Sequence, residues 1–202
     1  SKRWIYGDAE GRILGFVCRF ETAGGKEFRP LVLFVPAAGG PGRWRWASWP
    51  TPRPLYGLDR LHERPDAIVI VCEGEKAADA AERLAPDIVA VTSPNGSKGA
   101  GKADWSPLAR RRVVIWPDAD EPGAAYAEEV AARLHQFGAA SVAILSNPEG
   151  REPGWDAADA EATEIRPMPL VDLLVDRPIH RHRADGILPV RKHHSLAVTP
   201  DH

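Results

Sequence analysis

Four short apolar runs, separated by helix-like segments, constrain the fold more than any other feature of this sequence. The runs are Ala67–Cys72, Ile88–Thr92, Arg112–Trp116 and Ser141–Leu145. Each has the length and continuous hydrophobicity of a strand that is buried on both faces of a sheet. Between them, Lys76–Leu84 and Gly123–Phe137 have the composition of crossover helices. The alternation predicts a small α/β domain, with a four-stranded parallel sheet flanked by helices, over about residues 65–164.

The residues before this domain follow a different pattern. Arg12–Phe20 and Glu27–Val35 are β-rich runs with Gly24 and Gly25 between them, which predicts an antiparallel hairpin. Arg43–Trp46 alternates basic and aromatic residues with the period of a strand. We therefore expect residues 1–64 to form a small β-rich N-terminal subdomain.

Composition excludes several classes of protein. No apolar run approaches the ~18–20 residues of a membrane span, and the first residues lack the apolar core of a signal peptide. Cys18 and Cys72 are too few for a disulfide scaffold or a zinc ribbon, and their apolar surroundings favour buried free thiols. We expect a reducing, cytoplasmic location. Residues 165–202 hold five of the seven His and five Pro without periodicity, and we expect an extended tail.

The net charge of −2 conceals an asymmetry along the chain. Residues 1–64 carry 11 Lys and Arg against 6 Asp and Glu, whereas residues 65–164 carry 9 against 18. A basic front and an acidic middle indicate two surfaces with different partners.

Carboxylates follow three of the four predicted strands. The residues concerned are Glu73 and Glu75 after the first strand, Asp118 and Asp120 after the third, and Asp156 and Asp159 after the fourth. Since the carboxyl ends of parallel strands meet at one edge of the sheet, these side chains should converge there. Such a cluster repels itself unless it holds a cation, and oxygen ligands suit Mg²⁺ or Mn²⁺. The alternative is that acidic residues at helix starts serve only as caps, and Glu75, Asp79 and Glu121 fit that role.

These residues also carry a resemblance to a known family. The run from Val69 to Gly74 before a helix, and Trp116-Pro117-Asp118-Ala119-Asp120 about 45 residues later, resemble the Toprim domain of bacterial-type primases, type IA and II topoisomerases and some nucleases. Gly154–Asp159 is similar to the end of Toprim domains in phage and plasmid primases and primase-helicases. The resemblance is specific over residues 65–164, loose over 1–64 and absent after 165.

The resemblance implies a Toprim-like fold and a role for each acidic residue. Glu73 matches the glutamate proposed as general acid or base, and Asp118 and Asp120 match the metal-binding pair. Asp156 is the best match to the later acidic position, with Asp159 second. The implied chemistry is metal-dependent phosphoryl transfer, in which Mg²⁺ or Mn²⁺ offsets phosphate charge while a carboxylate handles the proton.

A glycine-rich loop, Gly96–Lys102, suggests a phosphate contact. It fits the first part of a P-loop, but Ala103 stands where a Ser or Thr should bind Mg²⁺, which argues against ATP hydrolysis. We expect Lys98 and Lys102, together with Lys76 beyond the first strand, to contact nucleotide or nucleic acid. A flexible loop with solvated lysines remains the alternative.

The basic and aromatic residues of Arg43–Trp46 suit a single-stranded nucleic acid, since cations bind phosphates and rings stack on bases. We expect Arg43 and Arg45 to contact nucleic acid, and Trp44 and Trp46 to fill a small β core. We further expect this basic face and the acidic edge to line one groove.

Together these features predict a primase-like nucleotidyltransferase. It would make primers on single-stranded DNA from nucleoside triphosphates in phage, plasmid or mobile-element replication, with a helicase domain or protein as a further partner. A metal-dependent Toprim nuclease and a non-catalytic nucleic-acid-binding module are the alternatives.

Overall fold

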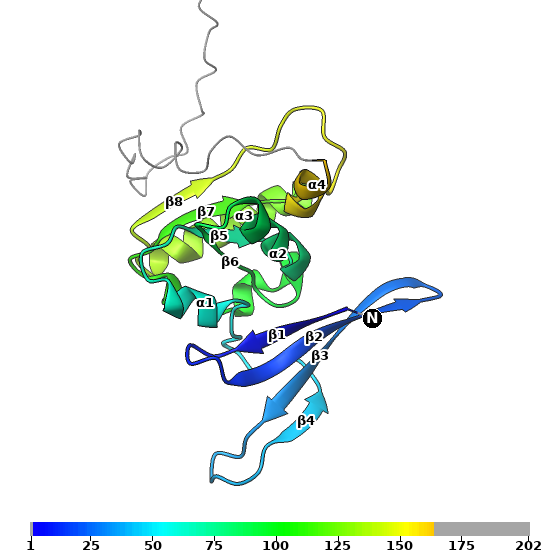
Figure 1. Cartoon of the computed structure of the whole chain (residues 1–202), viewed down its shortest axis with the longest axis vertical. Helices are drawn as coiled ribbons and strands as arrows, with labels where there is room; N and C mark the ends of the chain where they lie inside the picture. Colours follow the sequence, from blue (N-terminus) through cyan, green and yellow to red (C-terminus); the bar gives the residue numbers. More distant parts are fainter. Residues whose placement is uncertain (1, 164–202) are drawn as a thin grey trace, which may run out of the picture.

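The computed structural model describes residues 2–163 and builds them around two four-stranded sheets (Figure 1). The antiparallel sheet has the order β1-β2-β3-β4, and the parallel sheet has the order β6-β5-β7-β8. The predicted tail and its histidines lie outside the described residues. The boundary that we placed between residues 64 and 65 stays a prediction.

The strands and helices that the sequence predicts occur in the predicted order, and a first strand and a short helix before the parallel sheet are additional. The strands are β1 (Lys2–Gly7), β2 (Ile13–Thr22), β3 (Gly25–Phe34), β4 (Arg43–Trp46), β5 (Val69–Cys72), β6 (Val89–Val91), β7 (Arg112–Trp116) and β8 (Ser141–Ile144). The α-helices are α1 (Leu58–Glu63), α2 (Glu75–Leu84), α3 (Glu121–Gln136) and α4 (Ala157–Ala162). Three 3₁₀ turns, Gly96–Lys98, Ala100–Lys102 and Ser106–Leu108, lie between β6 and β7.

In the parallel sheet, β5, β6 and all of β7 except Arg112 are buried, as their continuous apolar runs predict, whereas β8 is half-buried with Ile144 exposed. β5 lies between β6 and β7, and all four of its residues are buried. Ile70 and Cys72 pack with the alanines of α2 and α4, whereas Val69 and Val71 pack with α3. This alternation places helices on both sides of the sheet and confirms the predicted Toprim-like α/β fold.

The antiparallel sheet packs against α2 through β1. Trp4 and Tyr6 are buried in the same core cluster as the alanines of α2. The Tyr6 hydroxyl donates to Glu75 Oε1 at 2.8 Å, and Trp4 Nε1 donates to Asp79 Oδ2 at 2.9 Å. The carboxylates of Glu75 and Asp79, which the cap interpretation assigned to helix ends, therefore connect the two sheets.

Trp44 and Trp46 do not fill a β core, so that expectation was wrong. They are 46% and 59% exposed, because β4 is an edge strand and nothing in residues 2–163 covers this part of the sheet. The predicted hairpin is present as β2 and β3. Cys72 is buried, whereas Cys18 is only half-buried, and neither forms a disulfide. Within residues 2–163, no helix has the length and hydrophobicity needed to cross a membrane.

Candidate active site

The predicted acidic residues converge at the carboxyl edge of the parallel sheet. Glu73 directly follows β5, Asp118 and Asp120 follow β7, and Asp156 immediately precedes α4. The Asp118 carboxyl experiences repulsion from Glu73, Asp156, Asp120 and Asp159, in that order of strength. Burial is the largest cause, and together with these neighbours it raises the pKa of Asp118 to about 8. The structure thus brings the four predicted carboxylates into one electrostatic cluster.

Glu73 combines burial with an unpartnered oxygen. Burial raises the pKa of its carboxyl, hydrogen bonding from Ser97 opposes that shift, and the nearby Asp120 adds to it. Within the described residues, Glu73 Oε2 is buried and has no hydrogen-bond partner. A buried oxygen without a donor is unfavourable unless a proton or a cation reaches it. The raised pKa and the unpartnered oxygen together make Glu73 a candidate for a functional group.

Asp120 and Asp156 belong to the cluster and also cap helices. Asp120 Oδ1 accepts a hydrogen bond from Gly123 N at 2.7 Å at the start of α3. Asp156 Oδ1 accepts from Ala158 N at 2.7 Å and forms a capping box with Asp159. The cap interpretation and the cluster interpretation are therefore compatible, because in both residues the cap bonds engage Oδ1.

Backbone contacts hold the two aspartate-bearing loops together. Ala119 N donates to Trp155 O at 2.9 Å, which ties the loop after β7 to the loop before α4. A Cβ atom on Gly123 would collide with the carbonyl oxygen of Asp118, so the third residue of α3 must be glycine. Asn147, whose amide donates to Pro117 O at 2.9 Å, supports the same loop from β8.

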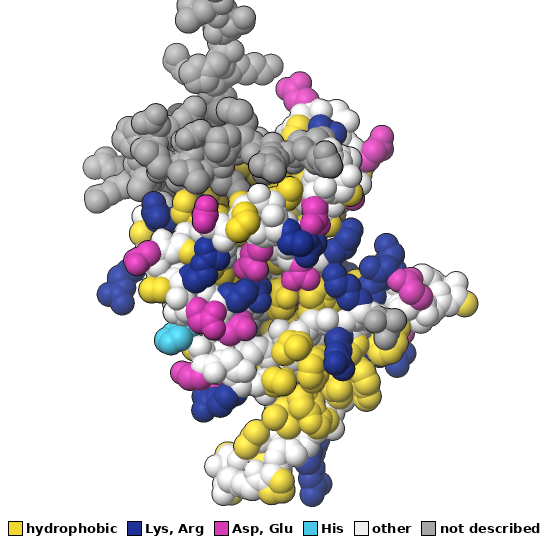
Figure 2. All heavy atoms as spheres, in the orientation of Figure 1, with side chains coloured by type: hydrophobic (Ala, Val, Ile, Leu, Met, Phe, Trp, Pro, Cys, Tyr) yellow, Lys and Arg dark blue, Asp and Glu magenta, His cyan; other side chains and the backbone are white. Residues whose placement is uncertain are grey.

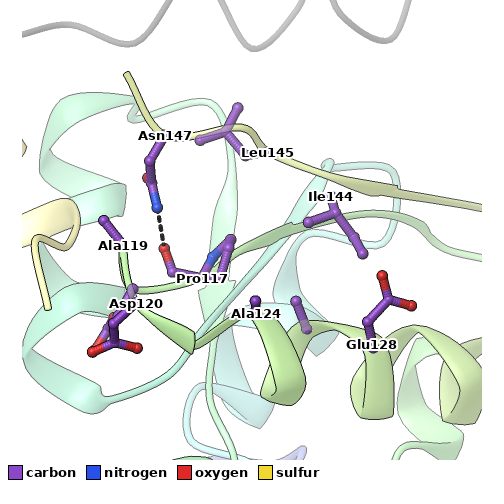
Figure 3. Close-up of a pocket in the computed structure, with 10 residues that line it drawn as sticks. Pro117, Ala119, Asp120, Ala124, Glu128, Ile144, Leu145 and Asn147 are labelled. Carbon is purple, nitrogen blue, oxygen red and sulfur yellow. Dashed lines mark hydrogen bonds between the residues drawn. The ribbon is translucent and has the colours of Figure 1, made fainter. Parts of the chain in front are cut away.

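A cavity of about 460 Å³ adjoins the cluster between the end of β7, the start of α3 and the end of β8 (Figure 3). Asp118 and Asp120 line one side of it, and Ala124, Ile144 and Leu145 supply apolar walls. Asn147, which also lines the cavity, was not predicted from the sequence. The rule that located Glu73 and Asp118 could have found it, because it too follows a parallel strand.

The donor set suits a hard divalent cation. In residues 2–163, no three His, Cys, Asp or Glu side chains are already gathered closely enough to hold an ion. The cluster nevertheless consists only of carboxylate oxygens, and it includes a buried oxygen without a donor and a carboxyl that is difficult to ionise. Mg²⁺ and Mn²⁺ are the ions that such oxygen ligands prefer, so these residues fit the predicted metal.

The glycine-rich loop packs as 3₁₀ turns beside this edge. Its lysines are exposed, as Lys76 is in the first turn of α2. Ala100 and Trp105 are buried, and Trp105 Nε1 donates to Ala100 O at 2.9 Å, so the loop is part of the core rather than a freely solvated segment. Since the turns lead to Asp104 and Trp105 rather than to an α-helix, the loop lacks the helix N-terminus of a P-loop.

Arg43 and Arg45 are not beside the carboxylates. They lie on β4, at the opposite edge of the sheet from β1, and β4 and α4 are at opposite ends of Figure 1. Both arginines are exposed, and the Arg45 guanidinium lies 5.5 Å from the centre of the Phe34 ring. They do not form the single groove that we expected with the acidic edge. Their contact with nucleic acid stays a prediction.

Comparison with solved structures identifies the fold of this chain. No protein-family model and no curated protein matches the sequence. The chain is similar to one in a bacteriophage T7 structure of the lagging-strand DNA polymerase interacting with primase domains bound to an RNA/DNA hybrid and dTTP. The TM-score is 0.54 and the identity 18%, over 80% of this chain and 70% of that one. The chain has the fold of a Toprim-like primase domain.

Two further primase structures share this fold. The primase fragment of the bacteriophage T7 primase-helicase gives a TM-score of 0.51 at 17% identity, over 80% of this chain and 58% of that one. The zinc-binding and RNA polymerase domains of the Aquifex aeolicus primase give a TM-score of 0.52 at 16% identity, over 79% of this chain and 36% of that one. The chain therefore spans somewhat over half of the T7 fragment and about a third of the Aquifex chain in that structure.

Proposed function

We propose that this chain is a primase-like nucleotidyltransferase that joins nucleotides on a single-stranded DNA template in the presence of Mg²⁺ or Mn²⁺. The observation that carries the proposal is the convergence of Glu73, Asp118, Asp120 and Asp156 at one edge of a primase-type fold. Burial and the neighbouring carboxylates raise the pKa of Glu73 and of Asp118, and carboxyls perturbed in this manner are typical of functional sites.

Each acidic residue has a role in the proposal. Asp118, Asp120 and Asp156 hold the cation, with Glu73 beside them. A bound divalent ion would offset phosphate charge and align the attacking oxygen. Glu73 takes or gives the proton of the reacting hydroxyl through Oε2, since its raised pKa brings it closer to neutral pH. Asp118 gives up its own proton when the cation binds.

The proposed partners follow from the neighbours and from exposed basic residues. One neighbouring structure contains an RNA/DNA hybrid and dTTP, and another is a fragment of a primase-helicase. By analogy we propose single-stranded DNA and nucleoside triphosphates as substrates, a helicase domain or protein as partner, and a role in phage, plasmid or mobile-element replication. Exposed Lys76, Lys98 and Lys102 would contact phosphates. The cytoplasmic location stays a prediction.

Primer synthesis on single-stranded DNA with labelled nucleotides tests the proposal. The wild type with Mg²⁺ or Mn²⁺ should incorporate labelled nucleotides into primers. In Glu73→Gln and Asp118→Asn the rate of incorporation should fall by about 100-fold or more. Glu121→Gln is the matched control, because Glu121 is an exposed carboxylate directly after Asp120 and should be dispensable.

The same assay separates the alternatives. Equal activity in all four proteins would refute the assigned roles. Metal-dependent cutting of DNA or RNA without incorporation would select the nuclease. Binding of single strands that survives loss of Asp118 and Asp120, with no catalysis in the wild type, would select the non-catalytic binding module.

A further inference from the structure

The antiparallel sheet has two chemically different faces. Residues that pair directly across neighbouring strands point to the same side of a sheet. Trp4 pairs with Val17, and both lie on the side that packs against α2. Phe16 pairs with Leu31, which in turn pairs with Trp46, so these residues share the opposite side.

On that opposite side, aromatic rings form two interacting pairs. Phe16 and Trp44 have ring centres 5.4 Å apart, and Phe20 and Trp46 have ring centres 6.0 Å apart. We call these four residues the aromatic face. Figure 2 shows hydrophobic side chains gathered over the antiparallel sheet, and the two tryptophans are about half exposed. Exposed rings of this size gathered on one side of a sheet indicate a binding surface.

Arginines lie over these rings. The Arg3 guanidinium is 5.6 Å from the centre of the Phe16 ring, and the Arg29 guanidinium is 5.8 Å from that of Phe20. The one carboxylate that the strands place on this side is Glu27, which pairs with Arg29 at 2.7 Å. The pair is bidentate, with a second hydrogen bond from Arg29 Nη2 to Glu27 Oε2 at 2.8 Å, but both side chains are exposed, so solvent screens it and Arg29 can exchange its partner for a phosphate.

We propose that the aromatic face binds single-stranded nucleic acid, with bases stacked on Trp44 and Trp46 and phosphates near Arg3 and Arg29. Base stacking on exposed aromatic rings, with cations for the backbone, is how single strands are held without sequence preference. The net positive charge of this side complements an anionic strand. A single strand supplies both flat bases for the tryptophans and phosphates for the arginines, whereas an acidic protein surface would meet only the arginines.

This assignment deepens the proposed function, because it names a surface that would hold the template. It differs from the sequence-based expectation, which assigned the nucleic acid to Arg43 and Arg45. Those arginines alternate with the tryptophans along β4 and therefore point to the other side of the sheet. A strand that stacks on Trp44 and Trp46 passes over the side turned away from α2.

Binding of a labelled oligothymidylate, measured by fluorescence anisotropy with EDTA and without nucleotides, tests the inference. Trp44→Ala/Trp46→Ala should raise the Kd by about tenfold or more, since two stacking rings are lost. Trp44→Phe/Trp46→Phe keeps the rings and should stay within about threefold of the wild type. Phe28→Ala is the matched control, because Phe28 is 52% exposed but lies on the other side.

Three outcomes would overturn the inference that the aromatic face binds single strands. An unchanged Kd in the doubly alanine-substituted protein, with a wild-type circular dichroism spectrum and melting temperature, would overturn the inference. A loss of binding in Phe28→Ala alone would place the strand on the other side and would overturn it too. So would a dimer of the wild type that the double substitution dissociates without changing the Kd. Because metal and nucleotides are absent, failure of primer synthesis leaves this test unaffected.

Discussion

Replacing Asp118 by Asn should stabilise the metal-free protein. The wild-type carboxyl is buried among other carboxylates, which raises its pKa to about 8. Because the pKa in the folded state exceeds that in the unfolded state, protonation contributes stability that is fully present below about pH 4 and is lost as pH rises toward 8. Asn does not ionise, so the variant avoids this loss and its advantage should grow with pH.

The size of the effect follows from the release of one proton. One proton changes the free energy of unfolding by about 1.4 kcal/mol per pH unit, so the interval from pH 5 to pH 8 sets a ceiling of about 4 kcal/mol. Asp118 is partly exposed, and solvent screening reduces that value. We expect the advantage of the variant to increase by about 1–3 kcal/mol across this interval.

Urea unfolding in EDTA, followed by circular dichroism at pH 5 and pH 8, measures this difference. Glu121→Gln serves as control, since this exposed neighbour should change stability by less than about 0.5 kcal/mol at either pH. The reasoning fails if Asp118→Asn is no more stable than the wild type at pH 8. It also fails if the advantage is the same at both values of pH, because repulsion among ionised carboxylates would then not be its source.

Three further predictions concern metal, the sheet contact and the loop after β7. Adding 10 mM Mg²⁺ should raise the melting temperature of the wild type by more than that of Asp118→Asn, and EDTA should reverse the shift. Tyr6→Phe removes the donor to the buried Glu75 and should lower the free energy of unfolding by about 1–3 kcal/mol at pH 7 in urea, and by less at pH 4, where Glu75 is protonated. Gly123→Ala should cost more than about 1 kcal/mol and reduce primer synthesis, because its Cβ displaces Asp118; an equal melting temperature would contradict this.

The parallel sheet could be predicted because burial on both faces leaves a continuous apolar run. For example, β7 has the same bounds as the strand predicted from the sequence, Arg112–Trp116. α1 was missed because it has only six residues and buries one of them, Leu61. β1 was missed because only one of its faces is buried, so its sequence mixes charged and aromatic residues.

The acidic cluster could be predicted because parallel strands bring their carboxyl ends to one edge. The sequence could not show which side of β4 is covered. Its residues alternate between arginine and tryptophan, and that alternation separates the two sides without saying which one packs against the core. The role of Glu75 was also hidden, because its partner Tyr6 lies 69 residues away and nothing local reports the contact. Contacts between distant segments depend on packing that no short motif records.

The contact between β1 and α2 limits how this protein can be recombined. Gly74 alone separates Glu73 from Glu75. The carboxylate that accepts the hydrogen bond from the Tyr6 hydroxyl therefore lies next to the proposed catalytic loop. A hybrid that joins this parallel sheet to another N-terminal sheet must supply a hydroxyl and an indole N–H in place of Tyr6 and Trp4. Without these donors, Glu75 loses the Tyr6 hydroxyl at the start of α2, and Asp79 loses the Trp4 indole while it keeps the Tyr56 hydroxyl at 2.7 Å. Exchange of the first strand therefore requires matching donors for α2 beside the parallel sheet.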